Sequence, residues 1–127
     1  LGDPVFDEWL APQVAEIADL LAAEDAPVFW SEATKVRIAR ANDPSSHWQD
    51  FPDNDPARVV RLNEIVAGEL AGRDNFHLLG TEDWLQTLPG GEFNPDYRAD
   101  GVHYTQLGAD EFAEWVIPKV LAAKDGG

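Results

Sequence analysis

The sequence contains no cysteine. Disulfide scaffolds, thiolate metal sites and cysteine nucleophiles are therefore excluded, while the redox compartment stays open because a chain without thiols fits either environment. No apolar run approaches the length of a membrane-spanning helix. Residues 1–4 do not begin with methionine and do not resemble a signal peptide, so we expect a fragment, a processed chain or a trimmed one.

Positive charge is also scarce, because Lys and Arg total 9 against 24 Asp and Glu and the formal net charge is -15. The electrostatic field of so negative a chain repels a nucleic-acid backbone and an anionic membrane surface, so we expect neither as a partner. We interpret most acidic residues as solvated helix faces. Apolar residues make up 44% of the chain, and its 127 residues fit one globular domain at most.

Three segments show the apolar spacing of helices. The first, 3–23, opens with an Asp cap and a Pro, and the second, 55–72, repeats that signal and stops at a Gly. The third follows Thr105 and is expected to kink at Pro118, with a frayed tail over 122–127. The apolar stripe predicted for the first helix comprises Phe6, Leu10, Val14, Ile17 and Leu21. The stripe of the last helix comprises Leu107, Phe112, Trp115, Val116, Val120 and Leu121.

A short apolar run over 26–30 predicts a strand buried on both faces, and residues 75–79 predict a second short strand. A long loop over 31–54 separates the first strand from the second helix, and one capped helical turn over 81–85 precedes a loop over 90–101. The alternation predicts an α/β layered fold with a parallel sheet. Two strands make a marginal sheet, so we expect the missing strands to come from an absent N-terminal half, a partner chain or self-association.

The sharpest motif is Asp100-Gly101-Val102-His103, ahead of the helix capped by Thr105. An Asp three residues before a His can accept a hydrogen bond from the imidazole Nδ1–H within one turn. That bond fixes the tautomer and leaves Nε2 free as a general base. Gly101 lets the backbone turn tightly. A capped turn with a surface His is the plainer interpretation of the same four residues.

The residues from Asp100 to His103, with Thr105, Gly108-Ala109 and a terminal helix, resemble the last conserved block of the SGNH (GDSL-type) hydrolase superfamily. The match is best for SGNH domains that are fused to membrane acyltransferases. The resemblance implies that Asp100 and His103 are the Asp and His of a Ser-His-Asp triad. His103 would deprotonate the serine and later protonate the leaving group, and no cofactor would be needed.

The order of predicted elements is also similar to part of that superfamily's fold. The resemblance implies a flavodoxin-like three-layer α/β fold, of which residues 1–127 supply the C-terminal half as helix, strand, helix, strand and helix. It further implies a serine esterase or O-acyl transfer activity on an ester substrate, with an O-acetylated carbohydrate as one candidate. A fusion to a membrane acyltransferase would place the domain outside the cytoplasm.

The nucleophile half of the family pattern is missing from this chain. Gly2-Asp3-Pro4 is not the Gly-Asp-Ser block, and the oxyanion-hole Gly and the Gly-x-Asn block are absent. Asn42-Asp43 lacks the Gly that the latter block requires. We therefore expect the serine and the oxyanion donors outside this chain. The alternative is a catalytically inactive acidic α/β fragment, or an interaction module, that retains the Asp-x-x-His by descent.

The only serines are Ser31, Ser45 and Ser46. Ser31 follows the first predicted strand, where ligands of parallel sheets bind, whereas the other two fit a turn. None has the Gly-rich elbow that exposes a nucleophilic serine. His47 and Trp48 are candidates for a substrate pocket, with a solvated loop His beside a packing Trp as the alternative.

Arg98 and Tyr104 flank the predicted site, and each is a candidate for substrate contact or for a packing or solvent role. His77 lies in a predicted strand and is interpreted as a structural His. The three His residues and the many acids show no metal-ligand spacing, so we expect no metal site.

Overall fold

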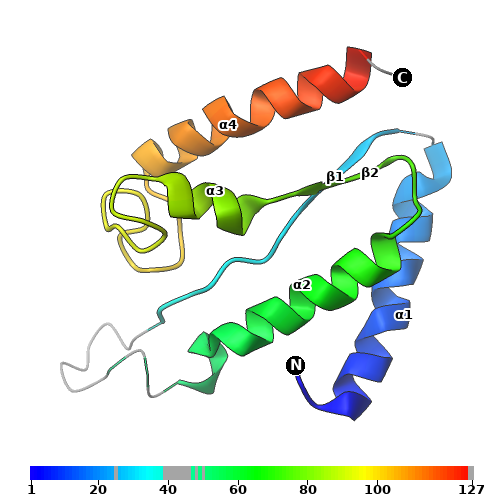
Figure 1. Ribbon diagram of the computed structural model, residues 1–127, viewed down its shortest axis with the longest axis horizontal. Coiled ribbons are helices and arrows are strands. Elements are labelled where there is room, and N and C mark those ends of the chain that lie inside the picture. Colours follow the sequence, from blue (N-terminus) through cyan, green and yellow to red (C-terminus); the bar gives the residue numbers. More distant parts are fainter. Residues whose placement is uncertain (25, 39–46, 48, 50, 126–127) are drawn as a thin grey trace. The chain divides into compact units, whose positions relative to one another are not determined.

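The computed structural model describes residues 1–24, 26–38, 47, 49 and 51–125, which belong to two compact units. The first unit comprises Leu1–Ala33 with Pro56–Thr81, and the second comprises Thr34–Asp55 with Glu82–Gly127. The described residues contain four α-helices and a two-stranded parallel sheet (Figure 1), which confirms the general α/β class.

The first unit begins with helix α1 (Pro4–Leu21), which a short 3-10 turn over Ala22–Glu24 extends. The Asp3 carboxylate accepts a hydrogen bond from the Val5 N–H at 2.9 Å, which confirms the predicted cap. Helix α2 (Pro56–Leu70) also starts at its proline. The predicted Gly stop lies two residues beyond its end.

Strands β1 (Val28–Ser31) and β2 (Phe76–Leu79) pair in parallel, with Val28 opposite Phe76 and Ser31 opposite Leu79. The prediction that the first strand is buried on both faces is wrong. Ser31 is exposed, and most of the other side chains in the two strands are only partly buried. The reason is that each four-residue strand has a single neighbour, so one edge of each lacks a partner within the described sheet.

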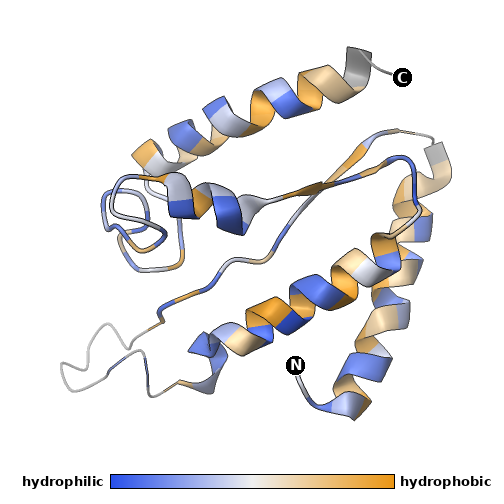
Figure 2. Ribbon diagram, viewed as in Figure 1, coloured by the Kyte–Doolittle hydropathy of each residue, from blue (hydrophilic) through white to orange (hydrophobic). Residues whose placement is uncertain are grey.

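Helices α1 and α2 lie side by side and supply the core of the first unit (Figure 1). The buried residues of this core are Val14, Ala18, Val66 and Leu70, with Leu10, Trp30, Leu62 and Phe76 packed against them. The apolar stripe predicted for α1 is wrong in part, because Phe6, Ile17 and Leu21 are 42% to 46% exposed. Apolar residues therefore remain on the surface of α1, and Figure 2 shows hydrophobic and hydrophilic positions interspersed along this helix.

The second unit contains most of helix α3 (Thr81–Thr87), all of helix α4 (Gln106–Asp125) and a 3-10 turn over Pro52–Asn54. Its buried core comprises Trp84, Leu85, Leu88 and Tyr97, with Tyr104, Phe112 and Trp115 packed around it. The rings of Trp84 and Trp115 stack with centroids 5.3 Å apart. This aromatic cluster ties the start of α4 to α3.

Two helix bounds differ from the prediction. Helix α3 is seven residues long, longer than the expected single turn, and α4 continues to Asp125 through residues predicted to fray. Ala122 and Ala123 explain the longer α4, because alanine has the highest helix propensity. Within the described residues, no helix combines the length and apolar character that crossing a bilayer requires.

Candidate functional site

The Asp100–His103 turn is shaped by a glycine with a left-handed backbone. Gly101 has a φ of +74°, and its N–H donates to the Arg98 carbonyl at 2.9 Å. A Cβ built on Gly101 would lie 2.9 Å from the Arg37 carbonyl oxygen, which is closer than side-chain atoms approach in folded proteins. The turn therefore requires glycine both for its dihedral angle and for its close backbone approach.

Asp100 holds His103 with both carboxylate oxygens. Oδ1 accepts hydrogen bonds from the Val102 N–H at 2.9 Å and from the His103 N–H at 2.7 Å. Oδ2 lies 2.7 Å from Nδ1 of the His103 ring. Because a carboxylate can only accept, Nδ1 carries the proton and the lone pair of the neutral ring lies on Nε2.

These contacts keep Asp100 ionised. The hydrogen bond from the His103 ring, followed by those from the backbone N–H groups of His103 and Val102, holds the pKa of Asp100 far below its usual range. The side chain of His103 is 82% exposed, and that of Asp100 is 56% exposed. No described residue hydrogen-bonds to Nε2 of His103, so this atom faces solvent as an available proton acceptor.

Helix α4 anchors the residues that follow the turn. The Thr105 hydroxyl accepts from the Gly108 N–H at 3.1 Å and donates to the Asp96 carbonyl at 2.6 Å, which confirms the predicted cap. Gly108 packs directly against the Tyr97 carbonyl, where a Cβ would collide with the backbone. The first turn of α4 is thereby fixed to the loop that carries Asp100.

Tyr104 packs inside the aromatic cluster of the second unit. Its ring lies 5.9 Å from Trp84 and 5.8 Å from Phe112, centroid to centroid. Burial raises the pKa of Tyr104, so the phenol is neutral at physiological pH. Of the two interpretations from sequence, this geometry favours packing.

Arg98 is 2% exposed and donates to the backbone carbonyls of Val102, Lys35 and Glu92. Burial lowers the pKa of Arg98, whereas nearby negative charge raises it, from Tyr104 once that phenol ionises and from the carboxylates of Glu92 and Asp100. Of the roles left open from the sequence, this burial favours packing, because the donors of the guanidinium point into the protein.

Part of the long loop predicted over 31–54 lies along the Asp100–His103 turn, an arrangement that sequence reasoning missed. The Arg37 N–H donates to the Gly101 carbonyl at 3.1 Å. The side-chain amide of Asn54 pairs with both the N–H and the carbonyl of Ile38, each at 2.8 Å. Nothing in the sequence signals these contacts, because an Asn that bonds to a distant backbone has no local pattern.

The remaining candidates from the sequence are Ser31, His47, Ser45, Ser46 and Trp48. Ser31 is the last residue of β1, and its hydroxyl lies 2.8 Å from the Thr81 hydroxyl in the first unit, whereas His103 belongs to the second. His47 is exposed. The predictions for Ser45, Ser46 and Trp48 fall outside the described residues.

His77 lies in β2, and its ring stacks on that of Phe29 with centroids 5.0 Å apart. This contact fits the structural role predicted for it. Within the described part of the chain, no group of three or more His, Asp or Glu side chains is placed to hold a metal ion.

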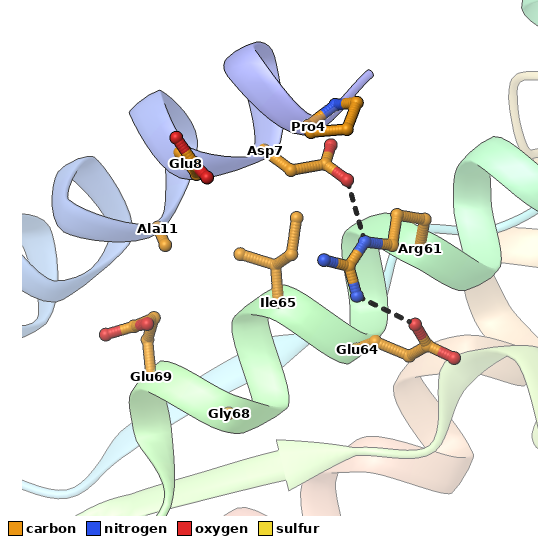
Figure 3. Close-up of a pocket in the computed structure, with 9 residues that line it drawn as sticks. All are labelled: Pro4, Asp7, Glu8, Ala11, Arg61, Glu64, Ile65, Gly68 and Glu69. Carbon is orange, nitrogen blue, oxygen red and sulfur yellow. Dashed lines mark hydrogen bonds and ion pairs between the residues drawn. The ribbon is translucent and has the colours of Figure 1, made fainter. Parts of the chain in front are cut away.

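A pocket of about 440 Å³ lies between α1 and α2 in the first unit (Figure 3), and neither Asp100 nor His103 lines it. Arg61 crosses this pocket. Its Nε donates to Asp7 at 2.8 Å, and its Nη1 donates to Glu64 at 3.1 Å. The Arg61 hydrogen bond lowers the pKa of Asp7. The contacts join the two helices and leave no unpaired cation in the pocket, so we interpret them as structural.

Comparisons with models of protein families, with curated proteins and with solved structures found no match to this chain.

Proposed function

We propose that this chain supplies the histidine–aspartate half of a serine-type acyl-transfer site, in an esterase or O-acyl transferase. The observation that carries the proposal is the bond between Asp100 Oδ2 and His103 Nδ1 at 2.7 Å, combined with an Nε2 that faces solvent. A hydrogen-bonded carboxylate orients the ring and selects the tautomer that a general base requires. The flavodoxin-like SGNH architecture, with this chain as its C-terminal half, belongs to the same proposal.

In the proposed reaction, Nε2 of His103 accepts the proton of a serine hydroxyl while the serine oxygen attacks the ester carbonyl. The imidazolium then protonates the departing alkoxide, and an acyl-serine remains. Water or an acceptor hydroxyl attacks the acyl-serine with His103 again as base, which restores the serine. Asp100 stays ionised throughout and stabilises the imidazolium, consistent with the lowered pKa of its carboxyl.

The serine and the oxyanion donors are proposed to come from a polypeptide segment that completes the domain. The high exposure of His103 supports this, because a general base in a finished active site is covered by substrate and neighbouring groups. The open edges of the two-stranded sheet support it as well. The substrate class is an ester, with O-acetylated carbohydrate as one candidate, and no cofactor is required.

The test is labelling with a fluorophosphonate, which reacts with activated serines, on the chain purified together with any polypeptide that associates with it. Denaturing intact-mass analysis then locates the adduct. We expect the adduct on an associated polypeptide and none on this chain. The adduct should disappear in His103→Ala and persist in His77→Ala, a matched control in β2.

Two outcomes would contradict the proposal. An adduct on Ser31, Ser45 or Ser46 that depends on His103 would show that this chain contains its own nucleophile. No adduct on any polypeptide would remove the support for an acyl-transfer site.

A second candidate is an interaction module without catalysis. Exposed apolar side chains favour it, since Val5, Trp9 and Leu20 of α1 are all well exposed to solvent. An associated polypeptide that co-purifies but never reacts with the fluorophosphonate would support this candidate over the enzyme.

A further inference from the structure

Arg98 is a buried cation whose hydrogen bonds to described residues all go to backbone carbonyls. It has the largest of the fully buried side chains in the described residues. Nε donates to the Val102 carbonyl at 3.1 Å, and Nη1 donates to the Lys35 carbonyl at 2.9 Å and to the Glu92 carbonyl at 3.5 Å. Burying a guanidinium is unfavourable unless its donors are satisfied, so this position needs a specific arrangement of acceptors.

The three carbonyls come from three separate stretches of the second unit. Lys35 lies within the long loop predicted over 31–54, Glu92 follows α3, and Val102 lies within the Asp100–His103 turn. Arg98 therefore connects the turn to the stretch around Glu92 and to Lys35, which is 63 positions away in the sequence. A planar guanidinium suits this task, because its donors diverge in a fixed geometry.

One peptide group lies between Arg98 and Asp100. The carbonyl of Val102 accepts from Arg98 Nε at 3.1 Å, and the N–H of the same peptide, which belongs to His103, donates to Asp100 Oδ1 at 2.7 Å. A cation thus binds the oxygen end of this peptide dipole and an anion binds its hydrogen end. Each hydrogen bond polarises the peptide in the direction that strengthens the other. Together the two hydrogen bonds fix the plane of the Val102–His103 peptide, to which the His103 side chain is attached.

We infer that Arg98 is a positioning residue for His103, which rests on the proposed function of His103 as a general base. By fixing the Val102–His103 peptide, Arg98 keeps the imidazole within hydrogen-bonding distance of Asp100 Oδ2. The neutral ring is thereby held in the Nδ1–H tautomer, with Nε2 available for the serine proton.

The test uses long-range ¹H–¹⁵N NMR, which reports the tautomer of each neutral imidazole in the chain. In the wild type we expect His103 to be in the Nδ1–H form. In Arg98→Met we expect loss of this preference, with the ring signals shifted toward those of an unconstrained imidazole. Arg73→Met is the matched control, because Arg73 also donates to backbone carbonyls, those of Glu69 and Ala15, but lies in the first unit.

If Arg98→Met does not fold, Arg98→Lys is measured in its place. Lysine keeps the charge but cannot reproduce the divergent donors to Val102 and Lys35, so the Nδ1–H preference should again be lost. Retention of that preference in a folded Arg98 variant would overturn the inference. Equal loss in Arg73→Met would also overturn it, because the effect would then be general loosening of the fold.

This measurement needs no catalysis, so its failure is distinct from that of the proposed function. A lost tautomer preference without any fluorophosphonate adduct would leave Arg98 as the residue that positions His103 but would remove the reaction. An adduct that depends on His103, with the tautomer unchanged in the Arg98 variants, would support the reaction but would remove the positioning role of Arg98.

Discussion

The carboxylate of Asp100 binds His103 at two points, the backbone N–H and the ring Nδ1, each at 2.7 Å. The two bonds use different carboxylate oxygens, so the ring is oriented relative to its own backbone. A side chain with only one such contact could still rotate about its χ angles. The geometry of this pair therefore sets both the position and the tautomer of an exposed imidazole.

Asp100→Asn should reverse the tautomer of His103. The amide oxygen can still accept from the backbone N–H groups, but the amide nitrogen presents donors to Nδ1, which favours the Nε2–H form and removes the base. Long-range ¹H–¹⁵N NMR measures the change, and His77 in β2 serves as an internal reference. An unchanged His103 tautomer in Asp100→Asn would show that the carboxylate does not control it.

The carboxyl of Asp100 should titrate well below the ordinary Asp pKa of about 3.9. Because the pKa of Asp100 is lowered in the folded turn, its contribution to stability is complete above the unfolded value and is lost as pH falls through the folded one. The ¹³C shift of the Asp100 carboxyl carbon measures this midpoint. In His103→Gln the midpoint should rise, because the largest cause of the shift is removed; a midpoint that stays in place would refute this.

Gly101→Ala should lower the free energy of unfolding more than Gly91→Ala. Both glycines have a positive φ, +74° and +77°, so each substitution should cost roughly 1 to 2 kcal/mol of backbone strain. Only at Gly101 would the new Cβ also meet the Arg37 carbonyl oxygen, at 2.9 Å, whereas nothing lies within 4 Å of a Cβ at Gly91. Urea unfolding of the two variants measures the difference, and equal losses would argue against the Arg37 contact.

Leu85→Ala should destabilise the second unit by about 2 to 5 kcal/mol, because Leu85 is fully buried and its loss leaves a cavity in the aromatic cluster. Leu20→Ala in α1 is the control, since Leu20 is 71% exposed and its truncation should change the free energy of unfolding by less than about 0.5 kcal/mol. Chemical denaturation followed by Trp fluorescence measures the loss, with Trp84 and Trp115 in the second unit and Trp9 and Trp30 in the first. A small effect at Leu85 would contradict the core described for that unit.

The sequence predicted the features that depend on neighbouring residues. The Asp3 and Thr105 caps follow from side chains that bond to backbone groups two or three positions away, and the start of α2 at Pro56 follows from the fixed φ of proline. The contact between Asp100 and His103 is of the same kind, because the two residues are three positions apart.

Only the tertiary structure decided which faces are buried and what supports the turn. Helical spacing marks Phe6 and Val14 as equivalent, yet only Val14 meets α2 and is buried. Arg98 resembles any charged residue in a loop, but its acceptors include Lys35, which is 63 positions away. Periodicity and capping are properties of a short stretch of chain, whereas the burial of a guanidinium depends on carbonyls that only folding brings together.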